Sequence, residues 1–225
     1  MTKFGCLLLL MCCVFETVAQ QRKHELSLTS GLSVPVGDFA STDITNSNAG
    51  RAMTGGNFSI NYQYNLSANI GLLLLLGGTS CEIDASNLVN TSVSPLTSET
   101  RYWSIGGYRA GGTFHTQLHK QLTVECRVTA GFNTVTFGGI LLSDHAGNTL
   151  EIAESSTAAF VYSLGVGAKY HLSRSIFIPL FIDFLGCKAN FSDVQRKENG
   201  INKEVLTLVR SVNYISLSAG LGFTF

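Results

Sequence analysis

The chain has 225 residues, of which 45% are hydrophobic and only 13% charged, and its 15 basic and 15 acidic side chains leave no net charge. This balance gives no indication of a nucleic-acid partner. The 23 glycines and 3 prolines favour strands and turns over helices. Beyond the N-terminus, the longest apolar run, residues 72–76, is far below the ~20 residues that a membrane-spanning helix needs.

The first 19 residues predict a secretory signal peptide. Lys3 gives a basic start, Leu7 to Phe15 a short apolar segment, and Ala19 a small residue at the cleavage position. We therefore expect a single mature domain of residues 20–225. Three cysteines would remain after cleavage: Cys81, Cys126 and Cys187. Their odd number and wide spacing favour neither a disulfide framework nor a zinc site.

Eight segments alternate apolar and polar residues, the pattern of strands with one apolar and one polar face. The expected strands are 24–34, 53–64, 68–81, 101–116, 122–137, 158–171, 175–191 and 213–225. Within the third strand, Leu73 and Leu75 break the alternation, because they share the face opposite to Leu72, Leu74 and Leu76. We predict that these two leucines point inward.

The connections alternate in length. Short turns are predicted at Asn65, His119 and Ser173. Long loops are predicted at residues 38–51, 81–100, 138–156 and 192–206, and the stretch from Asp193 to Glu204 is the most charged. Short turns on the periplasmic side and long loops outside are typical of outer-membrane barrels.

The last predicted strand places apolar residues on one face as far as the final aromatic residue. It resembles the closing strand of bacterial outer-membrane β-barrels, in which a terminal Phe is an assembly signal. The resemblance assigns that role to Phe225, Phe223 and Leu221. The run Val34-Pro-Val-Gly-Asp-Phe39 resembles a feature that follows the first strand in Bacteroidota-type outer-membrane β-barrel domain proteins.

On these motifs the chain resembles the outer membrane protein β-barrel domain family, broadly of the OmpA/OmpX or PorT type. The predicted fold class is all-β, an eight-stranded antiparallel up-and-down transmembrane β-barrel in a bacterial outer membrane. The resemblance implies outer-membrane lipid and the barrel-assembly machinery as partners. The alternative fold is a soluble periplasmic sandwich, in which the apolar faces would meet each other.

Aromatic residues near both ends of the predicted strands are typical of the girdles of such barrels. At the turn end they are Tyr62, Tyr64, Tyr170, Phe223 and Phe225; at the loop end they are Tyr102, Phe137, Phe160 and Phe191.

Few charged residues fall within the strands, and the alternation places six of them on the inward face. They are Glu25, Arg109, Glu125, Arg127, Lys169 and Asp183. An eight-stranded barrel is just wide enough for side chains to fill it, so charges there should be paired or hydrogen-bonded. We predict a structural network that plugs the barrel, with Glu125 and Arg127 as a natural pair. A gated polar path or a catalytic group is the alternative.

The search for catalytic patterns gives no candidate residue, cofactor or metal ion. Of five histidines, His119 and His171 lie at turns and His145 in a loop. The segment Phe114-His-Thr116 invites comparison with outer-membrane lipid A deacylases, but its spacing differs from their motif. An enzyme would need a His or Ser cluster beside an acid at one rim.

We therefore expect a non-enzymatic integral outer-membrane protein with a structural, interaction or accessory role. Its long loops would face outside and bind an extracellular protein or glycan; the PorT resemblance allows a role in secretion. The alternative is a narrow pore or a conduit for small hydrophobic molecules, which the inward Leu73 and Leu75 would support.

Overall fold

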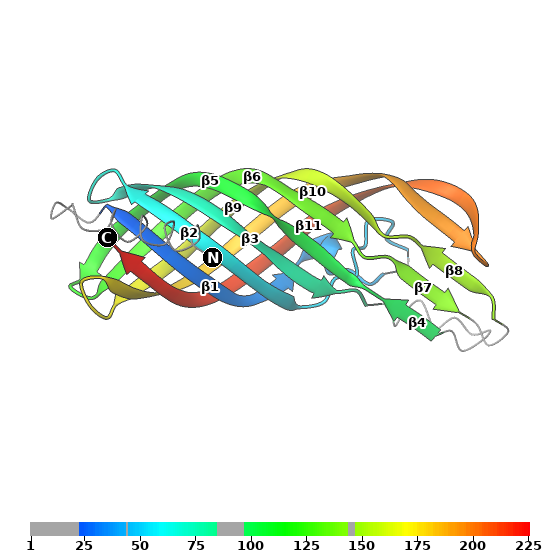
Figure 1. Ribbon diagram of the computed structural model, residues 1–225, viewed down its shortest axis with the longest axis horizontal. Helices are drawn as coiled ribbons and strands as arrows, with labels where there is room; N and C mark the ends of the chain where they lie inside the picture. The colour runs from blue at the N-terminus through cyan, green and yellow to red at the C-terminus, as the bar shows by residue number, and fades with distance from the viewer. Residues whose placement is uncertain (1–22, 44, 85–96, 144–146) are drawn as a thin grey trace, which may run out of the picture.

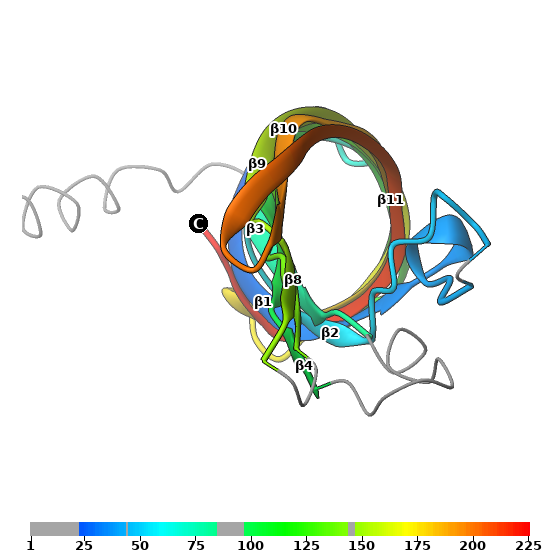
Figure 2. The ribbon, with the colours of Figure 1, turned by 90° about the vertical axis from the view of Figure 1, so that its right-hand side faces the viewer.

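The computed structural model describes residues 23–43, 45–84, 97–143 and 147–225. The predicted signal peptide lies outside these residues, so cleavage after Ala19 stays a prediction. Among the described residues, eleven strands form one antiparallel sheet, and eight of them follow one another around a ring. Figures 1 and 2 show this ring from the side and from its end. The ring strands, in order around the barrel, are β1 (His24–Pro35), β2 (Gly55–Asn65), β3 (Ile70–Glu82), β5 (Tyr102–His119), β6 (Leu122–Phe137), β9 (Ser155–His171), β10 (Ile176–Glu198) and β11 (Ile201–Thr224).

The first and last strands close the ring. β1 pairs with β11 in antiparallel register, with Leu26 opposite Phe223 and Leu28 opposite Leu221. At the end of the chain, the His24 amide donates to the Phe225 carbonyl at 3.1 Å, and the Phe225 amide donates to the His24 carbonyl at 2.9 Å. Closure leaves the ring without an open edge, as an eight-stranded up-and-down barrel requires. The predicted fold class is therefore confirmed.

The outward face of the ring is apolar. Its exposed large side chains include Leu72, Val128, Phe132, Leu164, Leu180 and Leu217. Tyr170 and Phe223 lie exposed near the short turns, and Tyr102 and Phe160 near the loops. Within the described part of the chain, no helix is long and apolar enough to cross a membrane.

Two aromatic residues predicted for the girdle at the loop end lie elsewhere. Phe137 and Phe191 are buried inside, where both rings lie against Trp103. The reason is strand parity. Phe137 is five residues after the outward Phe132, and an odd step along a strand changes the face.

The prediction of a loop at residues 192–206 is wrong. β10 and β11 continue to Glu198 and Ile201, and the connection is a turn at Asn199 (φ 51°) and Gly200 (φ 76°). Asn-Gly is the dipeptide that two-residue hairpins prefer, because both positions need positive φ. The charges that suggested a loop pair on the strands instead, with Arg196 near Glu198 (2.9 Å) and Glu204 (3.9 Å).

A smaller sheet extends from the loop end of the ring (Figure 1). The outer half of β10 pairs with β8, β8 with β7, and β7 with β4. These short strands are β4 (Thr97–Thr100), β7 (Ile140–Ser143) and β8 (Thr149–Ile152). Two of the predicted long loops thus contain strands. The 3₁₀ helix η1 (Gly37–Phe39) lies in the first long loop, between β1 and β2.

The interior divides into two halves. Towards the short turns it is polar, with buried side chains such as Asn61, Glu125 and Lys169. Towards the loops it is apolar, and a cluster that includes Trp103, Phe39 and Phe191 continues into the smaller sheet through Ile140 and Val194.

A charge placed on the outward face should prevent stable insertion. We expect Leu180→Arg to cost about 2–4 kcal/mol, the cost of Arg or Lys near the bilayer midplane. The measurement is folded yield in lipid, read from the shift in gel migration on heating. Thr207→Arg is the matched control, because Thr207 is exposed on β11 beyond its pairing with β1. Equal yields of the two variants would contradict the assigned lipid-facing surface.

Candidate functional site

The polar half of the interior is built around Lys169 on β9. Its Nζ lies 2.6 Å from Glu25 Oε2 on β1 and 2.6 Å from Glu125 Oε2 on β6. It also donates to Gln63 Oε1 on β2 at 2.9 Å. Asn65 donates to the second oxygen of Glu25 at 2.9 Å. One ammonium group thus joins four strands, and its positive charge is balanced by carboxylates in a space that excludes most water.

Arg127 and Asp183 form the second charged contact. Arg127 Nε donates to Asp183 Oδ1 at 2.6 Å, and Nη2 bonds to Oδ2. The guanidinium carbon also lies 3.6 Å from the centre of the Phe181 ring. A two-pronged contact between Arg and a carboxylate is among the stronger hydrogen-bonded pairs, and the ring below it supplies further cation–π attraction.

A glycine makes the Arg127–Asp183 contact possible. Arg127 on β6 lies opposite Gly165 on β9, which lies opposite Asp183 on β10. A Cβ at Gly165 would stand 1.9 Å from Asp183 Oδ1. The two charged side chains therefore meet across β9 only because the strand between them carries no side chain at this level.

The structure places all six predicted charged residues on the inward face, but one pairing differs from the prediction. Arg127 bonds to Asp183, and Glu125 bonds to Lys169, so Glu125 and Arg127 are not partners of each other. Glu125 and Arg127 are only two residues apart on one face of β6. The register between strands nevertheless brings each of them close to an opposite charge on another strand. Arg109 is buried and makes no ion pair with the described residues; it lines a small cavity with Asp183 and Tyr214.

Two small cavities lie among the buried polar side chains of the interior. The cavity beside Arg109 measures about 20 Å³, and a second, beside Lys169, about 10 Å³. One water molecule needs roughly 10–15 Å³ of such volume, so each holds about one water. Leu73 and Leu75 are 4% and 3% exposed, which agrees with their predicted inward direction. Leu75 lines the first of these cavities and Leu73 the second.

The loop between β1 and β2 packs against interior side chains at the loop end, a contact that was not predicted from the sequence. Trp103 donates from Nε1 to the Gly50 carbonyl at 2.9 Å, and Phe39 packs edge-on against it, with ring centres 5.4 Å apart. Arg210 on β11 donates to the Ser47 carbonyl at 2.6 Å. The alternation along β5 could have predicted the position of Trp103. Trp103 directly follows the outward Tyr102, and successive side chains of a strand point to opposite faces, so this large side chain points inward.

The histidines within the described residues do not assemble into a site. His24 bonds to Tyr62, and His171 to Thr123; His115 is buried in the polar half. His145 lies outside the described residues. Among the described residues, no group of three or more His, Cys, Asp or Glu side chains is placed to hold a metal ion.

A closed antiparallel ring with a lipid-compatible exterior and an ion-paired interior defines a small outer-membrane β-barrel. The sequence profile described as "Outer membrane protein beta-barrel domain" matches residues 4–225. The chain therefore belongs to the outer membrane protein β-barrel domain family, and its location is the outer membrane. No curated protein matches the sequence significantly.

Solved structures of low sequence identity resemble this fold. Neisserial surface protein A is 10% identical with a TM-score of 0.49, covering 90% of this chain and 97% of its own. A major outer membrane protein from Thermus thermophilus is 11% identical with a TM-score of 0.49, covering 90% and 99%. Ail, the attachment invasion locus protein of Yersinia pestis, is 14% identical with a TM-score of 0.44, covering 89% and 99%. Since these TM-scores are below 0.5, the family assignment rests on the sequence profile.

The three residues of the predicted assembly signal lie at the closing seam. Leu221 and Phe223 point outward, and the Phe225 ring stacks on His24 with centres 5.5 Å apart. Recognition of this end by the assembly machinery stays a prediction.

Loss of one buried charge should leave its partner unpaired. We expect Asp183→Ala to lower the free energy of unfolding by about 3–5 kcal/mol, because Arg127 would stay buried without its carboxylate. Denaturant titration in lipid measures this change. The matched control is Ser163→Ala, which removes a buried hydroxyl that bonds to Thr129 and should cost only about 1 kcal/mol. Equal costs would show that the ion pair contributes no more than one neutral hydrogen bond.

The loop between β1 and β2 should become less protected from amide exchange when the Phe39 ring is removed. We expect Phe39→Ala to speed amide exchange at Gly50 and Ala52, whose amides donate to the Asp38 and Phe39 carbonyls, because a Phe-to-Ala truncation in a core costs about 3–5 kcal/mol. Hydrogen exchange followed by mass spectrometry would localise the effect. Met53→Ala, an exposed truncation in the same segment, is the control. Unchanged exchange at residues 50 and 52 would mean that Phe39 does not hold this loop.

Proposed function

We propose that this protein is a non-enzymatic outer-membrane barrel that acts as an interaction or accessory protein through the sheet at its loop end. The observation that carries the proposal is the contrast between the two parts of the molecule. The ring is filled by paired charges and packed aromatics, whereas the outer part of β11 offers an edge that no described strand covers.

The filled interior speaks against a conduit. A path for solutes or small hydrophobic molecules would have to pass the Lys169 cluster, the Arg127–Asp183 pair and the core around Trp103. Opening that path would separate buried charges, and each broken pair costs several kcal/mol. The interior therefore suits a stable plug better than a passage.

The edge of β11 is suited to binding an extended segment. From Ile201 to Val209, β11 pairs with β10 on one side, and no described residue pairs with its backbone on the other. Ile201 and Val205 on this stretch are each 63% exposed. An unpaired strand edge is a template for another strand, with main-chain hydrogen bonds giving affinity and alternate side chains giving specificity. Since long loops of outer-membrane barrels face outside, the partner would be an extracellular protein segment.

Selection of displayed random peptides against the barrel in lipid nanodiscs tests this proposal. We expect the selected peptides to alternate apolar and polar residues and to lose binding about tenfold when Ile201 and Val205 are both replaced by lysine, a residue that natural proteins use to protect edges. Thr207→Lys is the matched control, because it adds a charge on the same face without removing an apolar side chain. It should keep most of the binding.

Two results would contradict the proposal. Peptides that bind the Ile201→Lys/Val205→Lys variant as well as the unaltered protein would remove the edge from consideration. Conductance steps of the purified, unaltered barrel in planar bilayers would show that the interior passes ions. The same steps in the Phe39→Ala variant would also favour the pore.

A further inference from the structure

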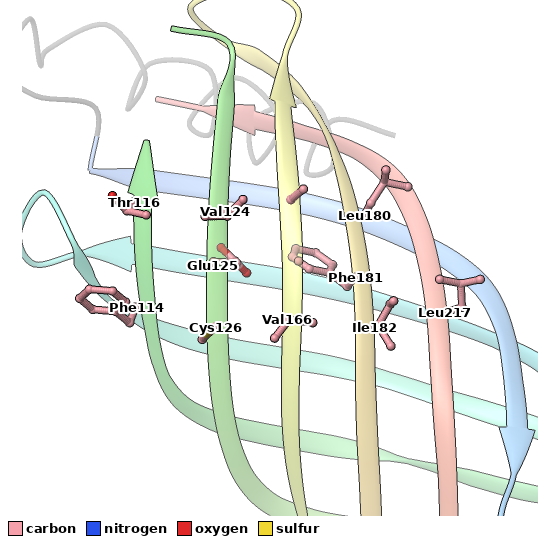
Figure 3. Close-up of a pocket in the computed structure, with 12 residues that line it drawn as sticks. Phe114, Thr116, Val124, Glu125, Cys126, Val166, Leu180, Phe181, Ile182 and Leu217 are labelled. Atoms are coloured by element: carbon pink, nitrogen blue, oxygen red, sulfur yellow. The ribbon is translucent and has the colours of Figure 1, made fainter. Parts of the chain in front are cut away.

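An apolar groove of about 620 Å³ lies in the outward wall of the barrel, over β5, β6, β9, β10 and β11 (Figure 3). Its volume falls within the range of about 300–1,000 Å³ typical of ligand pockets. It belongs to the lipid-facing surface and is separate from the interior and from the edge of β11.

The register of the strands explains the shape of this groove. One row across the wall is Phe114, Cys126, Val166, Ile182 and Leu217, and the next row towards the short turns is Thr116, Val124, Ala168 and Leu180. In the second row Thr116, Val124 and Ala168 are half-buried, whereas Phe114, Leu180 and Leu217 are each more than 50% exposed. Small residues thus form a floor between larger ones.

The inner side of the wall is tightly packed behind this floor. Phe181 lies against Gly167, where a Cβ would stand 2.1 Å from the ring, and the Glu125–Lys169 ion pair lies at the same level. The floor cannot deepen inward, so the groove takes its occupant only from the membrane.

The position of the groove limits the occupant to a hydrocarbon chain. In a bilayer core about 30 Å thick, one leaflet contributes about 15 Å. Thr116 and Phe114 are four and six residues before Lys120 in the β5–β6 turn, about 13 and 20 Å along a strand at about 3.3 Å per residue. A strand tilt of about 40° reduces these distances to about 10 and 15 Å along the bilayer normal. The groove therefore lies within one leaflet of the turn end, where no water competes for an apolar surface.

Basic residues stand at the turns below this groove. Lys120 lies exposed in the turn between β5 and β6, and Arg174 lies exposed between β9 and β10. The remaining short turn, between β2 and β3, has the sequence Leu66-Ser-Ala-Asn69 and carries no charge. The groove and the basic turns thus share the same strands, and positive charge at the membrane surface attracts anionic lipid headgroups.

We propose that this groove is a binding site for one glycerophospholipid of the turn-side leaflet, with an acyl chain over Cys126 and Ala168 and the phosphate near Lys120 and Arg174. The chain buries the apolar floor, and the two cations hold the headgroup. The site would distinguish one bound lipid from the lipids that surround the rest of the barrel.

Native mass spectrometry of the full barrel released from nanodiscs of phosphatidylethanolamine and phosphatidylglycerol tests the site. We expect one retained lipid, with phosphatidylglycerol preferred. Ala168→Phe fills the floor with an apolar ring and should reduce retention about tenfold. Replacing Lys120 and Arg174 by glutamine should reduce phosphatidylglycerol retention about fivefold for each charge removed.

Matched variants separate the groove from general effects on the membrane surface. Ala130→Phe makes the same change at an exposed outward position of β6 that does not line the groove, and Lys23→Gln removes an exposed charge before β1; both should retain lipid as the unaltered protein does. If Ala168→Phe folds poorly, as judged by heat-shifted migration, Cys126→Trp fills the same groove from β6.

Lipid retention that is unchanged in a folded groove-filling variant, or lost equally in Ala130→Phe, would overturn the proposed acyl-chain site. Unchanged phosphatidylglycerol preference in the double glutamine variant would overturn the headgroup site.

Discussion

The pairing of β1 with β11 is the constraint on which the rest of the structure depends. Backbone amides and carbonyls cannot stay unpaired in hydrocarbon, so the sheet must close, and closure at eight strands fixes the width of the interior. That width leaves room for little more than side chains, so buried charges gain from partners on other strands. The Lys169 cluster and the Arg127–Asp183 pair are such partners, whereas Arg109 is buried without an ion pair among the described residues.

The barrel also divides along its length. The polar half joins strands through charged side chains, and the apolar half around Trp103 packs like the core of a water-soluble domain. The apolar half continues into the sheet of β4, β7, β8 and the outer parts of β10 and β11, so the loop end is a folded extension with its own core. This arrangement places a packed sheet, with an edge of β11 that no described strand covers, beyond the ring, and the interaction role that we propose rests on it.

The number of ring strands and the direction in which most of their side chains point could be predicted, because alternation is a local property of the chain; the short strands β4, β7 and β8 were not predicted. The same rule, applied further, would have placed Phe137 and Trp103 inside, and the Asn199-Gly200 dipeptide would have replaced the predicted loop at 192–206 by a hairpin. The predicted girdle position of Phe137 relied on its being aromatic, and the predicted loop at 192–206 relied on its charged residues. In both cases the position along the strand was the better guide. In contrast, the predicted Glu125–Arg127 pair was wrong because the register between neighbouring strands, which the sequence of one strand does not show, decides which charges meet.

The sequence by itself determined an apolar outward face, a polar inward face with six charges, and a closing strand, because side-chain direction in a strand repeats every two residues. Only the tertiary structure decided which charges meet, since partners such as Arg127 and Asp183 are 56 residues apart in sequence and are joined across Gly165 by register. The tertiary structure also decided that the loop between β1 and β2 packs on Trp103 and that a groove forms beside Ala168. Each is made by neighbouring strands whose alignment depends on closing the whole ring.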